Sequence, residues 1–490
     1  MRKEKITSRK YSSFLGRGLQ RGHTHATVKQ FEKHECDIPQ EIYVRYIDRI
    51  RYGKQYGYEV LLKNQDRHPT GKIGVLVAEC GLPENYEYPF YANFMKHVFR
   101  YTLPSFLVPM ILADNGMGLI DPDNPLAREK FKPHQLVDAY GSFTNKSGKP
   151  YIECEVKWHP PASMKNPNDH GYFLYDGDGK SGTPDVCDKV GAKIAGWYYH
   201  KLIPEKKVSW RYQLRLVYDE AVQELSEHSP DTEFRYVFYM YPETISRALD
   251  ELLAASCKTI IYQSINCPVY TDFEDYGYVL PMLHEYIAER ARIIMADQLG
   301  NQPPMREAYL QILRDQLAGI PQRSSVLVIL SRHGHPFKKE TQDTLAQLYR
   351  QPLEQGVRQI MAERAAKWDV LWSFDDYADE YWDPKRLKYE TKAAYRRAIA
   401  EGYEYAIELP TEFPAENTDL MVFHAMKKFT AFSEYNCNQP IPYPDWDKPL
   451  VRTFREGKTT GIYAGCPVGP YRKYVVDALV GSLSPFLKKG

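Results

Sequence analysis

The chain has 490 residues, of which 43% are hydrophobic and 26% are charged. These values are typical of a globular protein with two or three domains and a sizeable core. A formal net charge of +1 gives no support for a general binder of nucleic acid or of acidic surfaces.

Residues 1–71 are polar, basic and poorly periodic, and we expect them to form an N-terminal extension. The segment has no apolar stretch of the kind found in secretory signals, although its Arg/Ser-rich composition leaves a transit peptide open. No run of about 18 apolar residues occurs in the chain, so no transmembrane helix is predicted, and a peripheral contact with a membrane is left open.

None of the eight cysteines forms a C-x-x-C pair, which argues against a zinc ribbon or a locally bound iron–sulfur cluster and favours reduced thiols in the cytoplasm.

Short apolar runs recur from residue 72 onward, and each is predicted to form a buried strand. In chain order they are 73–80, 234–241, 258–265, 325–331, 368–374 and 403–409. Helical patterns at 243–255 and 390–402 lie between some of them. The first places Ile245, Leu249, Leu252 and Leu253 on one stripe, and the second closes at Gly402. Strands that alternate with helices predict an α/β fold with two parallel sheets, each covered on both faces.

Residues 113–185 interrupt this alternation of strands and helices, because they are rich in Pro, Gly, Asp and Asn. We interpret them as a long irregular insertion.

Polar and titratable residues collect where the predicted strands end. SRHGHP at 331–336 follows one buried run, and PTEFPAENTD at 410–419 follows another. Ligands of open parallel α/β sheets bind beyond the carboxyl ends of the strands. Imidazoles and carboxylates at that edge indicate acid–base or metal chemistry.

These strand ends resemble the ferrochelatases. SRHGHP is similar to the family's S-A-H-[SG]-x-P motif, with His333 in the place of its histidine, and Gly81-Leu82-Pro83 resembles its G-x-P. PTEFPAENTD resembles its P-[VI]-G-F-x-[SA]-D-H-x-E, with Glu412 and Asn417 as departures. Further landmarks follow in the same order, including CPVYT at 267–271, Trp372-Ser373 and the C-terminal CPVGPYRKYVVDALVGSL. The resemblance covers roughly residues 72–485.

The resemblance implies two flavodoxin-like three-layer domains with a cleft between them. The first would span 72–280 and include the 113–185 insertion. The second would span 281–425, and residues 426–490 would pack back on the domains. The implied reaction inserts Fe²⁺ or another divalent metal into a porphyrin or related tetrapyrrole in haem biosynthesis. The metal is then a substrate, and neither a tightly bound cofactor nor an iron–sulfur cluster is expected.

The implied chemistry assigns roles to particular residues. A macrocycle loses two pyrrole protons as the metal enters, and a neutral imidazole can accept one of them. The resemblance implies that His333 and Asp419 are catalytic, and Glu416 of the same strand-end loop is a further catalytic candidate. The metal would be bound by His333 and Asp419, with His335 as a candidate from its position beside them. The porphyrin would be bound by Gly81, Pro83, Tyr270 and Trp372, and Arg332, a departure from the motif, is a candidate for its carboxylate substituents.

Two other interpretations remain open at this point. One is a non-catalytic tetrapyrrole- or metal-binding protein on a chelatase scaffold. The other is a plain α/β metal-binding enzyme that uses His333, His335 and Asp272.

Overall fold

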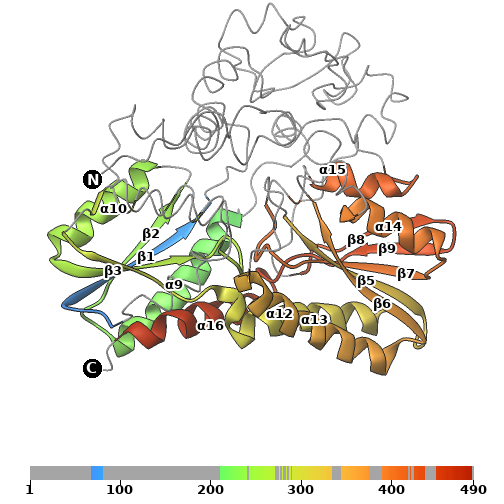
Figure 1. The fold of residues 1–490 in the computed structure, drawn as a ribbon, viewed down its shortest axis with the longest axis horizontal. Helices are drawn as coiled ribbons and strands as arrows, with labels where there is room; N and C mark the ends of the chain where they lie inside the picture. The colour runs from blue at the N-terminus through green and yellow to red at the C-terminus, as the bar shows by residue number, and fades with distance from the viewer. Residues whose placement is uncertain are drawn as a thin grey trace, which may run out of the picture.

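The structure is a computed structural model, and it describes residues 68–80, 210–239, 242–270, 290–333, 344–375, 389–417, 424–435 and 448–487, with positions 275, 279, 283, 286, 287 and 420. The fold is α/β, with two sheets side by side and helices on both faces of each (Figure 1). The predicted fold class is thereby confirmed. The predicted 113–185 insertion and the extension before residue 68 lie outside the described residues.

The first sheet has the strand order β2–β1–β3–β4, and all its pairs are parallel. Its strands are β1 (Lys72–Glu79), β2 (Glu233–Phe238), β3 (Cys257–Ser264) and β4 (Arg292–Met295). The strands predicted at 73–80, 234–241 and 258–265 are confirmed. β2 ends earlier than predicted because a helix begins at Pro242, whose fixed φ suits the first turn of a helix. The sequence pattern did not indicate β4, which has only four residues.

The second sheet has the order β6–β5–β7–β9–β8. Its strands are β5 (Ser325–Arg332), β6 (Lys367–Phe374), β7 (Tyr405–Pro410), β8 (Arg452–Glu456) and β9 (Thr459–Tyr463). The strands predicted at 325–331, 368–374 and 403–409 are confirmed. β8 pairs antiparallel with β9 at the edge of the sheet, and neither strand was predicted.

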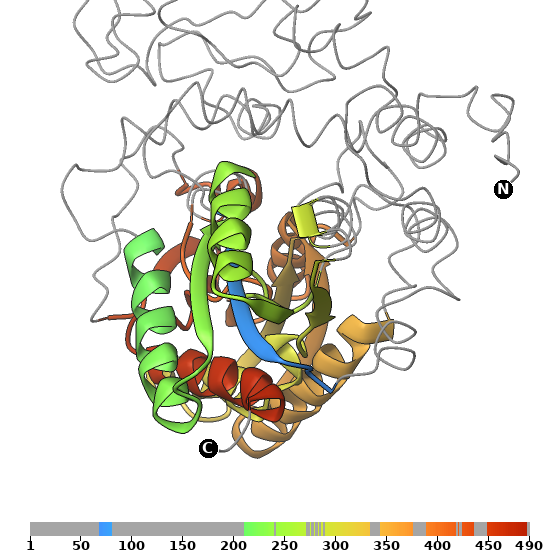
Figure 2. The ribbon, with the colours of Figure 1, turned by 90° about the vertical axis from the view of Figure 1, so that its left-hand side faces the viewer.

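Helices cover both faces of each sheet (Figures 1 and 2). On the first sheet, α10 (Pro242–Ala254) covers one face, while α9 (Trp210–His228) and α16 (Arg472–Leu483) pack together on the other. On the second sheet, α12 (Pro303–Ala318) and α13 (Thr344–Arg364) cover one face, and α14 (Thr391–Ala400) and α15 (Ala425–Lys428) lie on the other. Short 3-10 turns are η5 (Leu299–Asn301), η9 (Phe429–Ala431) and η10 (Ser484–Phe486). None of the helices in the described ranges is both long and apolar enough to cross a membrane.

The two helices predicted from the sequence form for the expected reasons. In α10, Ile245, Leu249 and Leu252 are fully buried, as the predicted stripe requires. After α14, Gly402 adopts a positive φ of 68°, the left-handed conformation in which a glycine ends a helix without strain.

The chain crosses between the two units more than once. β4 extends the first sheet to Met295, past residue 280, where the sequence places the end of the first domain. α16, close to the C-terminus, packs against α9 of the first unit and against α12. One buried apolar core continues through both units, so the two sheets are held in one packed body.

Gly461 of β9 lies directly under the ring of Phe432, and a Cβ at this position would overlap ring carbons of the phenyl group. Because Phe432 is fully buried, the ring has no room to move. We expect Gly461→Ala to lower the free energy of unfolding by about 1–3 kcal/mol.

Urea unfolding checks this prediction. Gly319→Ala is the matched control, because its φ of −82° suits alanine and a Cβ there would approach no atom closer than 3.4 Å. Equal stability of Gly461→Ala and the control would contradict the close packing described here.

Candidate functional site

Each sheet has a point where the strand order reverses. The chain runs from β1 outward to β2 and then returns to β3 on the other side, and it does the same with β5, β6 and β7. In open α/β sheets the carboxyl edge at such a point is where ligands bind, because the connecting loops diverge there. The two relevant edges are therefore β1/β3 in the first sheet and β5/β7 in the second.

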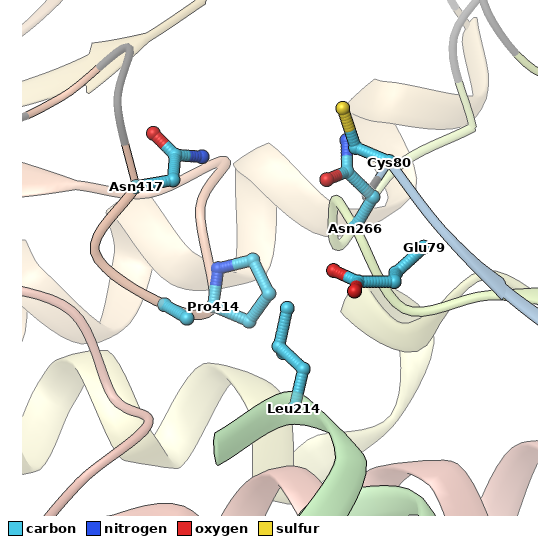
Figure 3. A pocket seen from close by; sticks show the side chains of 7 residues that line it. Glu79, Cys80, Leu214, Asn266, Pro414 and Asn417 are labelled. Atoms are coloured by element: carbon cyan, nitrogen blue, oxygen red, sulfur yellow. The ribbon is translucent and has the colours of Figure 1, made fainter. Parts of the chain in front are cut away.

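A pocket lies between these two edges (Figure 3). One side is formed by the ends of β1 and β3, and the other by the loop after β7. The pocket is partly open, and its empty space together with the adjoining solvent is about 260 Å³. Its lining residues are Glu79, Cys80, Asn266, Leu214, Pro414, Ala415 and Asn417. The pocket thus combines a buried carboxylate and two carboxamides with apolar groups.

His333 follows β5 directly, and its side chain is half-buried. Its ring centroid lies 5.9 Å from that of Phe413, the residue before the pocket-lining Pro414. It also lies 5.7 Å from the ring centroid of His424. The structure therefore brings the predicted catalytic histidine to the loop that forms one wall of the pocket.

Glu416 stands in the same loop, between the pocket-lining residues Ala415 and Asn417. Its carboxylate is buried and accepts hydrogen bonds from the Tyr463 hydroxyl at 2.8 Å and from the Cys466 backbone N–H at 2.9 Å. Burial outweighs these hydrogen bonds and raises the pKa of Glu416 from 4.5 to about 7. A carboxyl group with such a pKa can exchange protons near neutral pH.

This pKa shift predicts a pH-dependent stability. The folded state binds the Glu416 proton more tightly than the unfolded state, so the associated stability is present below about pH 4.5 and is lost as the pH rises through about 7. The expected loss is roughly 3 kcal/mol. We expect Glu416→Gln to remove this part of the pH dependence and to be more stable than the wild type at pH 8.

Urea unfolding at pH 5 and pH 8 measures the effect. Glu227→Gln, an exposed change on α9, is the control and should retain the wild-type slope. An unchanged slope in Glu416→Gln would show that Glu416 does not titrate in this range.

The other predicted site residues do not gather at the pocket. Arg332 is half-buried, and its guanidinium carbon lies 3.9 Å from the centroid of the Phe374 ring. The Trp372 indole N–H donates to Glu354 of α13 at 2.8 Å, so this side chain faces the helix layer. Tyr270 is buried against Tyr262 and is absent from the pocket lining. Gly81, Pro83, His335, Asp419 and Asp272 lie outside the described residues.

Two helices support the loop after β7. Tyr309 of α12 donates its hydroxyl hydrogen to the Phe413 carbonyl oxygen at 2.9 Å, and Tyr349 of α13 donates to that of Thr411. Arg350 of α13 forms a buried ion pair with Glu412, with Nε and Oε1 3.1 Å apart. Glu412 stands where the resembled motif has glycine, and here it ties the loop to α13.

A buried charged cluster lies behind His333, and sequence reasoning missed it. It consists of Asp375, Glu408, His424 and Lys428. The Lys428 Nζ lies 3.2 Å from Asp375 Oδ2 and also forms an ion pair with Glu408. Burial alone would raise the pKa of Asp375, but the charges of Lys428 and His424 outweigh it and lower that pKa below its ordinary value.

One of these residues left a signal in the sequence. Glu408 lies between Ile407 and Leu409 in the run YEYAIEL, and a carboxylate buried between apolar neighbours needs a partner. Asp375 and Lys428 each stand beside a second residue of the same charge, as surface residues often do, so their positions carry no such signal. His424 lies in the apolar stretch LMVFHAM, which indicates burial but not a charged cluster. His424 is in addition in π-helical backbone, a conformation frequent at functional sites. Among the described residues, no group of three or more His, Cys, Asp or Glu side chains could hold a metal ion.

Comparison with known proteins adds little to this picture. No family model and no curated protein matches the chain. One similar solved structure is a suggested transcription regulation repressor of the LacI family from Corynebacterium glutamicum. It is 9% identical, with a TM-score of 0.25, and the match covers 55% of this chain and 86% of that one. The transcription regulator CcpA of Lactococcus lactis is 11% identical, with a TM-score of 0.25, over 56% of this chain and 88% of that one. Similarity at this level supports no conclusion about this chain.

The fold and the site by themselves define a class. The chain is a two-sheet α/β protein whose pocket lies between the strand ends of the two sheets, with an imidazole and a buried carboxyl group in the segments that follow β5 and β7.

Proposed function

We propose that the protein is a ferrochelatase-like enzyme that inserts ferrous iron, or another divalent metal, into a porphyrin or related tetrapyrrole. The observation that carries the proposal is the position of His333. It follows β5 at the reversal point of the second sheet and packs on the loop that walls the pocket between the two sheets. The SRHGHP motif around it is the most specific part of the resemblance to the ferrochelatases.

The residue types suit this reaction. Metal insertion releases two pyrrole protons, so the site needs groups that accept protons near neutral pH. His333 is a half-buried imidazole, and Glu416 is a carboxyl group whose pKa burial raises to about 7. In the proposed reaction these two groups take up the pyrrole protons, and the metal is a substrate that passes through the site.

Arg332 is proposed to bind the carboxylate substituents of the macrocycle. It precedes His333 in the chain, and its guanidinium group is held over the Phe374 ring, which limits its freedom before a ligand binds. Asp419 and His335 are proposed as metal-contacting groups, and Gly81, Pro83, Tyr270 and Trp372 as porphyrin contacts. The role of His335 rests on its place two residues after His333, and the other five rest on the resemblance.

The proposed compartment is the cytoplasm, where a peripheral membrane contact is compatible with the proposal. Four cysteines in the described ranges, Cys80, Cys257, Cys267 and Cys466, are buried free thiols, which suits a reducing compartment.

Anaerobic mixing of the purified protein with Fe²⁺ tests the proposed function. Protoporphyrin and coproporphyrin are supplied in turn, while porphyrin fluorescence and the Soret band are followed. Catalytic loss of fluorescence with growth of a haem spectrum, faster than in a protein-free control, is the expected result. A Soret shift that saturates at one ligand per chain without turnover would reject the enzyme in favour of a tetrapyrrole-binding protein. No spectral change with either porphyrin would reject both.

A further inference from the structure

The imidazole of His333 belongs to a group of three rings. The His333 and His424 rings are 5.7 Å apart at an interplanar angle of 69°. Phe413 lies 5.9 Å from His333 and 5.6 Å from His424, so each ring touches the other two. The two contacts of His424 are edge-to-face and that of His333 with Phe413 is tilted, and a displaced ring loses such contacts. The orientation of His333 therefore depends on where His424 is held.

His424 is in turn held in place by a buried carboxylate. It is fully buried, and its Nδ1 lies 3.3 Å from Oδ2 of Asp375. The same Oδ2 is 3.2 Å from the ammonium group of Lys428, which favours the ionised carboxylate. The negative charge of this carboxylate attracts the Nδ1 side of the ring, which favours one ring orientation of His424.

The contacts of Lys428 lead back to β5, the strand that His333 follows. Lys428 also pairs with Glu408 of β7, and the Ser331 hydroxyl donates to Glu408 Oε1 at 2.7 Å. Ser331 is in β5, two residues before His333. The path from Ser331 through Glu408, Lys428, Asp375 and His424 to His333 thus starts and ends on the same strand end.

All members of this path except His333 are buried. Burial of charged groups is costly, and apolar side chains of similar volume would fill the same space. The path nevertheless ends at His333, its one partly exposed member, which lies at the site. A buried polar path with this layout is suited to fixing the direction of a reactive side chain.

We propose that His424, held by Asp375 and Lys428, is a positioning residue that fixes the imidazole of His333 in the site. In the context of the proposed function, on which this part rests, the correct orientation of His333 is needed for proton transfer in metal insertion.

The first test is independent of activity. The histidines are labelled with ¹³C in their rings, and the His333 signal is identified by its loss in His333→Ala. We expect His424→Ala and Asp375→Asn to shift or broaden that signal, because the neighbouring ring is removed or released. Ser482→Ala is the control, since it removes a buried 2.7 Å hydrogen bond to Gln263 Oε1 and neither residue belongs to the path. An unshifted His333 signal in His424→Ala would overturn the proposal.

The second test uses steady-state insertion of Zn²⁺ or Fe²⁺ into the porphyrin that the wild type accepts. We expect His424→Ala to lower kcat about 10²-fold with little change in the KM for porphyrin, because a misplaced catalytic group affects turnover more than binding. His424→Phe, which retains a ring, should recover part of this loss. The double variant with Asp375→Asn should be no slower than the slower single variant, as expected for residues that act as a unit.

The outcomes separate the two proposals. If the wild type inserts no metal, the proposed function fails, while the His333 signal still decides whether His424 positions His333. If the wild type is active and Ser482→Ala loses as much kcat as His424→Ala, the effect is general destabilisation and the positioning role is rejected.

Discussion

Replacement of His333 by alanine is expected to lower the rate of metal insertion by about 10²–10⁴-fold, the usual contribution of a positioned acid or base. The side chain is half-buried and its described ring contacts are to Phe413 and His424, so the fold should survive its loss. The measurement is the initial rate of porphyrin fluorescence loss under anaerobic conditions, together with the thermal unfolding midpoint of the variant.

His228→Ala is the matched control for this change. His228 is exposed at the last turn of α9 and is absent from the pocket lining, so its loss should leave turnover unchanged. Normal turnover in His333→Ala would remove the basis of the proposed function. A large fall in the unfolding midpoint would instead show that His333 is needed for the fold.

Replacement of Lys428 by methionine is expected to lower the free energy of unfolding by about 3–5 kcal/mol, because it leaves two buried carboxylates without their counter-ion. The side chain is 1% exposed and lies between Asp375 and Glu408. Urea unfolding at neutral pH measures the effect. The deficit should shrink when Asp375→Asn and Glu408→Gln are added, since the uncompensated charges are then gone.

Lys473→Met provides the comparison for Lys428→Met. Lys473 pairs with Asp477 on α16, but its side chain is 70% exposed, so its loss should change stability by no more than about 1 kcal/mol. Similar small effects in both variants would mean that Lys428 does not balance the buried carboxylates as described.

The confirmed predictions share a physical origin. Each confirmed strand is a short run rich in apolar residues, and each confirmed helix carries its own stripe or terminal glycine. Burial varies with position in the sheet, since β2 and β6 at the sheet edges are largely half-buried. β4 and the β8–β9 hairpin were missed because they are short and lack such runs: β8 reads RTFRE and is at most half-buried. These strands depend on the neighbours that they pair with.

Individual site residues show the same difference between what local sequence predicts and what the packed structure decides. Trp372 was assigned to the site from the resemblance of Trp372-Ser373 to a family landmark, but its indole N–H donates to Glu354 of α13. The direction of a side chain depends on which face of the sheet each helix covers, and the run WDVLWSF contains no information on that. Glu416 could be selected as a candidate, but its raised pKa arises from its burial in the packed structure, which outweighs the hydrogen bonds from Tyr463 and Cys466.

Local hydrophobic pattern was sufficient for the α/β class, for six of the strands, and for the placement of His333 where a buried strand ends. These properties follow from interactions between residues close together in the chain. The contact of His333 with His424, the Asp375–Lys428–Glu408 ion pairs and the pocket between the two sheets arise only when distant segments meet. Their energies depend on distance and on exclusion of water, and both are set by the packed structure.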